Sequence, residues 1–230
     1  MSMAEAQQLA AQTVMAVRAG HNLSDELSSI FAAHPQLSPQ DKGALQDMAF
    51  GCQRFSGSLR FMLAEMLNKP IDNQQLESLL IVALYQLNHS RNAAHAVVNE
   101  AVSQVARIDQ GQYRSFANAI LRRFQREKDT LNSKCKTDEV AKYNMPEWLS
   151  GYLKDHYPKH WHNIITACTN HPPMTLRINC RHTTAEHYIE QLQAVGLDGK
   201  TLGDYTIKLN QPAPVSQLPG FEEGTVSVQD

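Results

Sequence analysis

The sequence predicts an all-α domain followed by a small α+β domain, and three observations predict this class. Apolar residues recur at helical spacing over residues 1–130, the pattern lapses into a polar segment at 131–142, and short stretches within 143–230 alternate apolar and polar side chains as strands do. We therefore expect a helical domain at 1–130, a linker at 131–142 and the α+β domain at 143–230.

The composition is that of a soluble globular protein. Of the 230 residues, 42% are apolar and 19% are charged, values typical of a chain with a packed core. The sequence has no uninterrupted apolar run of membrane-spanning length and no secretory signal at its start, so we expect a cytoplasmic protein without a membrane partner. Its four cysteines have no paired spacing, which argues against a disulfide framework or a zinc site.

The first helices are predicted from apolar spacing and from capping residues. The first helix has an apolar face formed by Leu9, Thr13, Val14 and Val17. The second spans Leu23–Ala33, with Ser24 as its expected N-cap. Ser38 should cap the third, because Pro39 then occupies the first helical position, where its missing N–H costs nothing.

The helical pattern becomes most regular in the middle of this domain. Gly51 and Gly57 are expected to break the third helix before a fourth, which includes Leu59 to Met66 and ends at Pro70. The clearest period follows, at Leu76, Leu79, Leu80, Ala83, Leu84 and Leu87. The next helix repeats it at Val97, Val98, Ala101, Val102 and Val105. Six or seven helices without strands make an all-α domain.

The last of these helices combines an apolar face with a basic one. Its apolar residues are Phe116, Ile120, Leu121 and Phe124, while Arg122, Arg123 and Arg126 lie on a largely opposite arc. From 107 to 142 there are nine Lys/Arg against five Asp/Glu, although the chain sums to −2. This surface is either an ordinary solvated face or a phosphate-binding one. The RNA-binding candidates are Arg114, Arg122, Arg123, Arg126, Lys128 and Arg177.

The second domain is predicted from short alternating stretches and from prolines. Pro146 and Pro158 can each open a short helix, and a further helix is expected from Thr184 to Val195. Three stretches alternate as strands do: Thr175 to Asn179, Tyr205 to Leu209 and Thr225 to Gln229. Together they predict an antiparallel or mixed sheet.

No catalytic, cofactor or metal site is predicted. Residues 194–201 fit a relaxed phosphate-loop pattern, but a helix precedes them where a strand is needed, so we interpret them as the turn after that helix. His156, His160 and His162 lie close together, but Pro158 interrupts the helix that would align the first two, and we interpret them as surface histidines. No cysteine has a recognisable nucleophile context, and the dinucleotide-binding glycine pattern does not occur.

The residues also carry a family resemblance, which covers essentially the whole chain. The helical part resembles the NusB-like RNA-binding domain at Phe50-Gly51, Leu84 to Leu87, Ala94 to Val102 and Phe116 to Phe124. The second part is similar to the bacterial small-subunit ribosomal RNA 5-methylcytosine methyltransferase B family. It resembles that family's second domain at Pro172 to Asn179, and the lead-in to its catalytic domain at Pro219 to Gly224 and Val226 to Asp230.

This resemblance implies an RNA-recognition fragment. In that family the catalytic domain comes next and holds a Rossmann-like sheet, a Gly-rich loop for S-adenosylmethionine and two cysteines, whereas this chain stops at Asp230. The implied full-length parent is an S-adenosylmethionine-dependent ribosomal RNA cytosine-5 methyltransferase, and the fragment itself is no enzyme and binds no cofactor. Its implied partners are small-subunit ribosomal RNA and its own C-terminal methyltransferase domain, and not DNA.

Two other functions are weighed against this one. A stand-alone NusB-like RNA-binding factor of the antitermination type would have no need of the second domain. A protein–protein scaffold would use the arginines to bind acidic partners, and competition by salt and by RNA would distinguish it from both RNA-binding alternatives.

Overall fold

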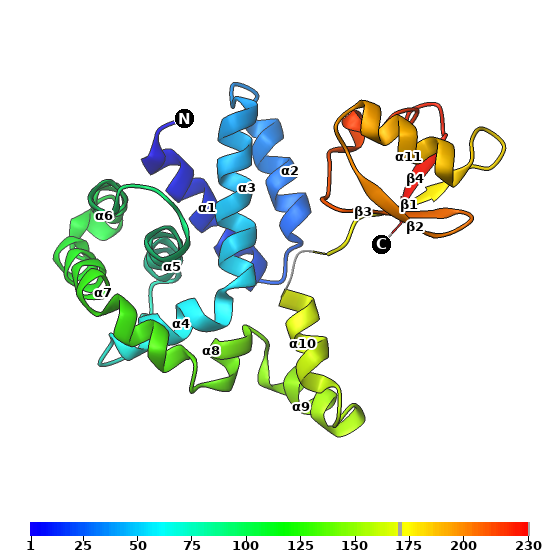
Figure 1. The fold of residues 1–230 in the computed structure, drawn as a ribbon. Helices are drawn as coiled ribbons and strands as arrows, with labels where there is room; N and C mark the ends of the chain where they lie inside the picture. The colour runs from blue at the N-terminus through cyan, green and yellow to red at the C-terminus, as the bar shows by residue number, and fades with distance from the viewer. Residues whose placement is uncertain (170–171, 230) are drawn as a thin grey trace. The chain divides into compact units, whose positions relative to one another are not determined.

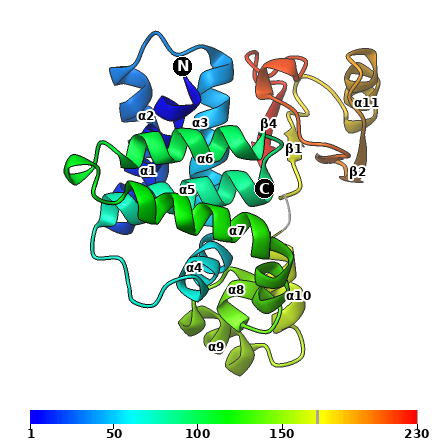
Figure 2. The same ribbon diagram turned by 90° about the vertical axis from the view of Figure 1, so that its left-hand side faces the viewer.

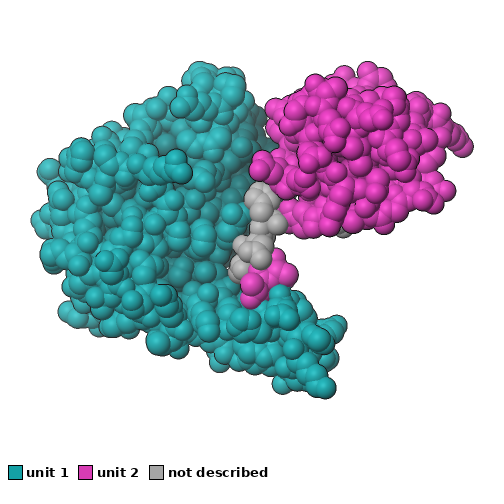
Figure 3. Space-filling model, viewed as in Figure 1, with its two compact units in different colours: residues 1–165 teal, residues 166–230 magenta. Residues whose placement is uncertain are grey.

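A computed structural model describes residues 1–169 and 172–229, which divide into two compact units. The first unit is Met1–Ile165 and the second is Thr166–Asp230 (Figure 3). The first is built from helices, and the second contains a four-stranded sheet with a helix. This confirms the predicted fold class.

The helices follow one another with short connections (Figure 1). Their bounds are α1 Met3–Arg18, α2 Leu23–Ala33, α3 Pro39–Arg54, α4 Ser56–Glu65, α5 Gln74–His89, α6 Ala94–Val105, α7 Arg114–Cys135, α8 Glu139–Tyr143, α9 Glu147–His156 and α10 Trp161–Thr169. A short 3-10 helix, η1 Asp109–Gly111, precedes α7.

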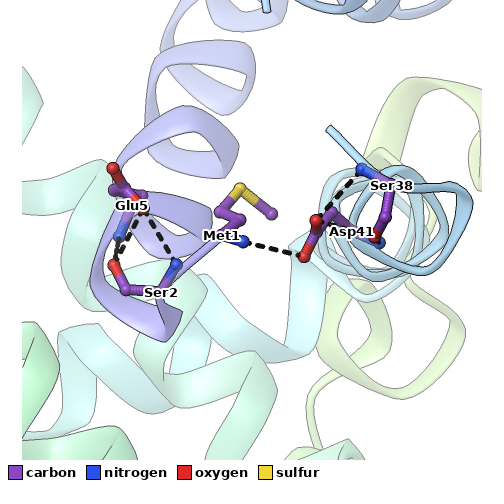
Figure 4. Close-up of polar contacts among 5 residues, drawn as sticks. All are labelled: Met1, Ser2, Glu5, Ser38 and Asp41. Atoms are coloured by element: carbon purple, nitrogen blue, oxygen red, sulfur yellow. Dashed lines mark hydrogen bonds and ion pairs between the residues drawn. The ribbon is translucent and has the colours of Figure 1, made fainter. Parts of the chain in front are cut away.

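Side chains with hydrogen-bonding oxygens begin several of these helices (Figure 4). Ser2 with Glu5 and Ser38 with Asp41 form reciprocal caps at the starts of α1 and α3, so the predicted cap at Ser38 is confirmed. The amino group of Met1 pairs with Asp41 Oδ1 at 3.2 Å and so joins the two helix starts. Hydrogen bonds donated by Ser38 hold the pKa of Asp41 below its usual value.

The predicted cap of α2 is wrong. Asn22, and not Ser24, begins this helix, because the Asn22 side chain accepts hydrogen bonds from the backbone N–H groups of Ser24 and Asp25.

Helix α5 lies at the centre of the first unit. It contacts α1, α3, α4, α6 and α7, and Figure 2 shows α6 and α7 running beside it. Every residue from Ser78 to Leu87 is buried, as expected of a core helix whose apolar residues extend beyond one face. The buried Gln7 side chain of α1 donates to Gln86 Oε1 at 2.7 Å and so ties α1 to this centre.

The break between the third and fourth helices lies at Phe55 and not at a glycine. Helix α3 continues through Gly51, and α4 already includes Gly57. Both glycines serve close packing instead. A Cβ at Gly51 would overlap the Tyr85 ring of α5, and one at Gly57 would overlap the backbone of Val140 in α8.

Residues 131–142 differ from the predicted linker. Helix α7 runs to Cys135, and α8 follows at Glu139. Leu131, Cys135 and Ala141 are buried in the core of the first unit. Polar side chains interrupt the apolar pattern here because only some residues of this segment face the core, while others, such as Ser133 and Lys134, are exposed. The division into a 1–130 and a 143–230 domain therefore stays a prediction. Along the chain, the boundary between the two compact units follows Ile165.

The second unit is an antiparallel sheet with one face covered. Its strands are β1 Thr175–Ile178, β2 Gly199–Gly203, β3 Thr206–Leu209 and β4 Val226–Gln229, in the order β2-β3-β1-β4. Helix α11, Ala185–Ala194, lies across one face, and its Tyr188 and Leu192 pack with Leu176 and Ile207 (Figure 1). A short 3-10 helix, η2 Val215–Gln217, lies between β3 and β4.

Strand β2 has no counterpart among the predicted strands. It contains the second half of the phosphate-loop-like stretch, and Gly199 and Gly203 at its ends weaken any strand signal. Gly199 is required where it lies, because a Cβ there would come within 2.8 Å of the carbonyl oxygen of Lys208 on β3.

Candidate nucleic-acid interface

Helix α7 has the two faces that the sequence predicts, with one exception. Ala117, Ile120, Leu121 and Phe124 are buried in the helical core. The sequence predicts Phe116 beside them, but it is 37% exposed because it lies at the edge of the apolar stripe, in the first turn of the helix. Replacing exposed residues on the other face therefore leaves this core intact.

The three arginines of the predicted basic face of α7, Arg122, Arg123 and Arg126, have different surroundings. Arg123 Nε donates to Glu127 at 3.0 Å, and its Nη1 donates to the carbonyl oxygen of Met66 at 3.1 Å, so this side chain fastens α7 to the end of α4. Arg122 is exposed, and among the described residues it donates only to Gln125, at 3.2 Å. Arg126 is exposed and makes no hydrogen bond or ion pair with any residue that the structure describes. Of these three arginines, Arg122 and Arg126 are thus available to a ligand.

The remaining candidates of the helical unit also differ. Lys128 Nζ donates to the carbonyl oxygen of Leu87 at 2.8 Å, which commits its ammonium group to the end of α5. Arg114 is exposed at the first position of α7, where a positive charge opposes the helix dipole. It lines a surface hollow of about 660 Å³ between α6 and α7, together with Asn99, Ser103 and Asn118. These amide and hydroxyl groups can donate hydrogen bonds to a phosphate.

Arg177 lies on the second unit, at the centre of the sheet face that α11 leaves open. Its neighbours across the strands are Thr206 and Ser227. Two further cations, Lys200 and Lys208, lie on this face and were not among the predicted RNA-binding residues. Alternation within β3 could have found Lys208, because Ile207 and Leu209 are buried and Lys208 must point the other way. Lys200 required knowledge that residues 199–203 form a strand.

The phosphate-loop-like stretch, the clustered histidines and the buried cysteines have ordinary structural surroundings. Helix α11 ends at Ala194, Gly196 turns the chain with a φ of +78°, and β2 follows, so residues 194–201 do not form a phosphate loop. His156 stacks on Tyr152, and His162 packs edge-on against Tyr143. Burial raises the pKa of Cys52 and Cys135, which keeps these thiols protonated.

The described part of the chain offers neither a metal-binding cluster nor a membrane-spanning helix. Residues 1–169 and 172–229 hold no group of three or more His, Cys, Asp or Glu side chains arranged to bind a metal ion. Among the helices described, none is both long and apolar enough to cross a membrane.

Comparison with known proteins places both parts of the chain in described families. Residues 4–126 match the NusB family, and residues 145–216 match the Methyltr_RsmF/B-like, ferredoxin-like domain. Because the first match covers more than half of the sequence, the chain belongs to the NusB family.

Several curated proteins that are similar to this chain bear the same name. Ribosomal RNA small subunit methyltransferase B of Citrobacter koseri is 36% identical over 227 residues, which cover 96% of this chain and 52% of that protein. The protein of the same name from Vibrio vulnificus is 35% identical over 92% of this chain and 50% of its own length. That from Pseudomonas syringae pv. tomato is 37% identical over 88% of this chain and 46% of its own length. The chain thus spans about half the length of the curated relatives it matches.

A solved structure shares the fold. The crystal structure of PH0851 matches 100% of this chain and 54% of its own, with a TM-score of 0.59 and 13% sequence identity. At this identity the likeness concerns the fold alone.

Proposed function

We propose that this chain recognises small-subunit ribosomal RNA and positions it for S-adenosylmethionine-dependent cytosine-5 methylation. One observation carries the proposal. A NusB match is followed by a match to a methyltransferase-associated ferredoxin-like domain, and the sequence that contains both aligns over 96% of its length with a ribosomal RNA small subunit methyltransferase B. The exposed Arg114, Arg122, Arg126 and Arg177 supply the positive charge that RNA recognition needs.

Methyl transfer itself is assigned to no residue of this chain. S-adenosylmethionine is held by a Gly-rich turn between a strand and a helix. The described residues do not fit this cofactor, because their one phosphate-loop-like stretch follows a helix, α11, and leads into a strand, β2. We propose that a methyltransferase domain, corresponding to the half of the relatives that this chain does not match, supplies the cofactor and the attacking thiolate. RNA recognition is then the part played by these 230 residues.

A stand-alone antitermination-type factor is the less favoured function. Such a factor needs only the helical domain, whereas residues 145–216 match a domain type named for methyltransferases. The curated relatives also align through both parts of the chain.

The proposal predicts that Arg122 and Arg126 of α7 contribute to RNA affinity through phosphates. Replacing Arg122 and Arg126 by alanine should weaken binding to a small-subunit ribosomal RNA fragment. The slope of log affinity against log salt should flatten by about one to two units, because each phosphate contact contributes about 0.7 to 0.9. Arg123 is left unchanged because it bonds Glu127 and Met66. A salt series of fluorescence anisotropy titrations measures the slope.

A matched control at the C-terminal end of the same helix removes the same charge. The control variant is Lys134→Ala/Lys136→Ala. In the parent chain Lys134 already pairs with Glu65, at 2.6 Å, so we expect the slope of this variant to stay within about half a unit of the parent value. If the arginine variant is folded and keeps the parent slope and affinity, this face is ordinary solvated surface.

A further inference from the structure

The open face of the sheet in the second unit is polar and basic. Pairing of the four strands assigns seven side chains to this face, in two rows across the sheet. One row is Lys200, Lys208, Thr175 and Gln229, and the other is Thr206, Arg177 and Ser227. The opposite face carries Leu176, Ile178, Ile207 and Leu209, which are buried beneath α11.

The positive charge on this face has no structural use. Lys200 and Lys208 lie directly opposite each other on neighbouring strands, an arrangement of like charges that destabilises a sheet. None of the seven paired positions is acidic, and within the described residues neither lysine nor Arg177 forms a salt bridge. A folded domain gains nothing from three unneutralised cations on one small surface, so the arrangement points to an anionic ligand.

A surface hollow adjoins Arg177 at one end of the face. It has a volume of about 510 Å³ and is lined by Arg177, Asn179, Tyr205 and Ser227, among others. The Tyr205 side chain is 58% exposed at the tip of the β2–β3 hairpin. A ring exposed beside a cation is the combination on which an unpaired nucleobase stacks while its phosphate is bound.

We propose that this face binds single-stranded RNA, with phosphates on Arg177, Lys200 and Lys208 and one base in the hollow beside Tyr205. The proposal rests on the proposed function, for which it names the form of RNA and the surface. Thr175, Thr206 and Ser227 place hydroxyl groups between the cations, where they can bond phosphate oxygens or 2′-hydroxyls. The face therefore contacts mainly the RNA backbone.

Two features favour single-stranded RNA over other anionic partners. A protein interface has an apolar centre, and the paired positions of this face carry no apolar side chain. Duplex RNA is read across its minor groove with its bases stacked inside, which leaves no base to enter the hollow. The central strands also carry Thr, Arg and Lys where base-stacking sheets carry aromatic rings, so binding should depend little on base sequence.

The test compares two variants of the whole chain with equal changes of charge. In the sheet variant, Arg177, Lys200 and Lys208 are replaced by glutamine. In the control, glutamine replaces Lys69, Lys136 and Lys159, which are exposed in the helical unit. The probe is a labelled single-stranded RNA of mixed sequence, titrated over a salt series. Circular dichroism checks that each variant is folded.

The sheet variant should bind at least about tenfold more weakly at 0.1 M salt, with a slope shallower by about two units, since a single-strand contact contributes about 0.7. The control should keep the parent slope. A third variant, Tyr205→Ser, should lose about fivefold or more in affinity without a change of slope.

The outcomes separate this inference from the proposed function. If the parent binds RNA and the folded sheet variant binds it with the same slope and affinity, the sheet proposal is overturned while the proposed function stands. If the parent binds no RNA, both are overturned. An unchanged affinity of the Tyr205→Ser variant contradicts the seating of a base in the hollow.

Discussion

Replacing Phe124 by alanine is expected to lower the free energy of unfolding of the helical unit by about 3–5 kcal/mol. The Phe124 side chain is fully buried on α7, inside the core that also contains Leu121 and Ile120. Removing its ring leaves a cavity that the packed helices around it can fill only in part. Urea denaturation followed by circular dichroism at a helical wavelength measures the loss.

Phe116 on the same helix is the matched control. Its side chain is 37% exposed, so Phe116→Ala removes the same atoms from a site that water already reaches. We expect this variant to lose less than half as much stability. Equal losses for the two variants would mean that the buried face of α7 is assigned incorrectly.

Replacing Gly57 by alanine is expected to destabilise the helical unit by about 1–3 kcal/mol. The new Cβ would overlap the carbonyl oxygen of Val140 and would lie 3.0 Å from the Cα of Asn144. Both are backbone atoms at α8 and its end, which cannot turn away as a flexible side chain would. Asn144 Oδ1 also accepts a hydrogen bond of 2.8 Å from the backbone N–H of Ser58, so moving α8 costs this contact as well.

Gly43 supplies the opposite expectation. It lies exposed in α3, and a Cβ there would meet no atom within 4 Å. Gly43→Ala should therefore stabilise the protein by about 0.5–1 kcal/mol, because alanine loses less backbone freedom on folding. Both variants are compared by urea denaturation. A stabilising effect of Gly57→Ala would show that residues 139–144 do not pack on α4.

Sequence patterns predicted the parts of the fold that local physics determines. The apolar period of α5 and the cap at Ser38 depend on residues within a few turns of each other, and both are confirmed. The packing of residues 131–142 depends on contacts with α4, which lies far away in sequence. Strand β2 forms because its backbone pairs with β3, and not because residues 199–203 have a strand pattern. Such features are set by tertiary contacts that a linear pattern does not contain.

The candidate site was predictable in outline and not in detail. Helical spacing correctly placed Arg122 and Arg126 on an exposed face. It could not show that Arg123 bonds the carbonyl oxygen of Met66 or that Lys128 bonds that of Leu87, because both acceptors come from other helices. Conversely, Lys200 was considered only as part of the phosphate-loop-like stretch and Lys208 belonged to no predicted site. Both became candidates only when strand pairing placed them with Arg177.

Recognition of small-subunit ribosomal RNA is the central claim, and equilibrium competition tests it most directly. The chain is bound to a labelled RNA at physiological salt and challenged with overlapping fragments that together cover small-subunit ribosomal RNA. Fragments of large-subunit ribosomal RNA of equal length serve as the reference. We predict that at least one small-subunit fragment competes about tenfold or more better than the reference fragments, since specificity is a ratio of affinities at one salt concentration. Equal competition by all fragments, or no RNA binding by the folded chain, would contradict the claim.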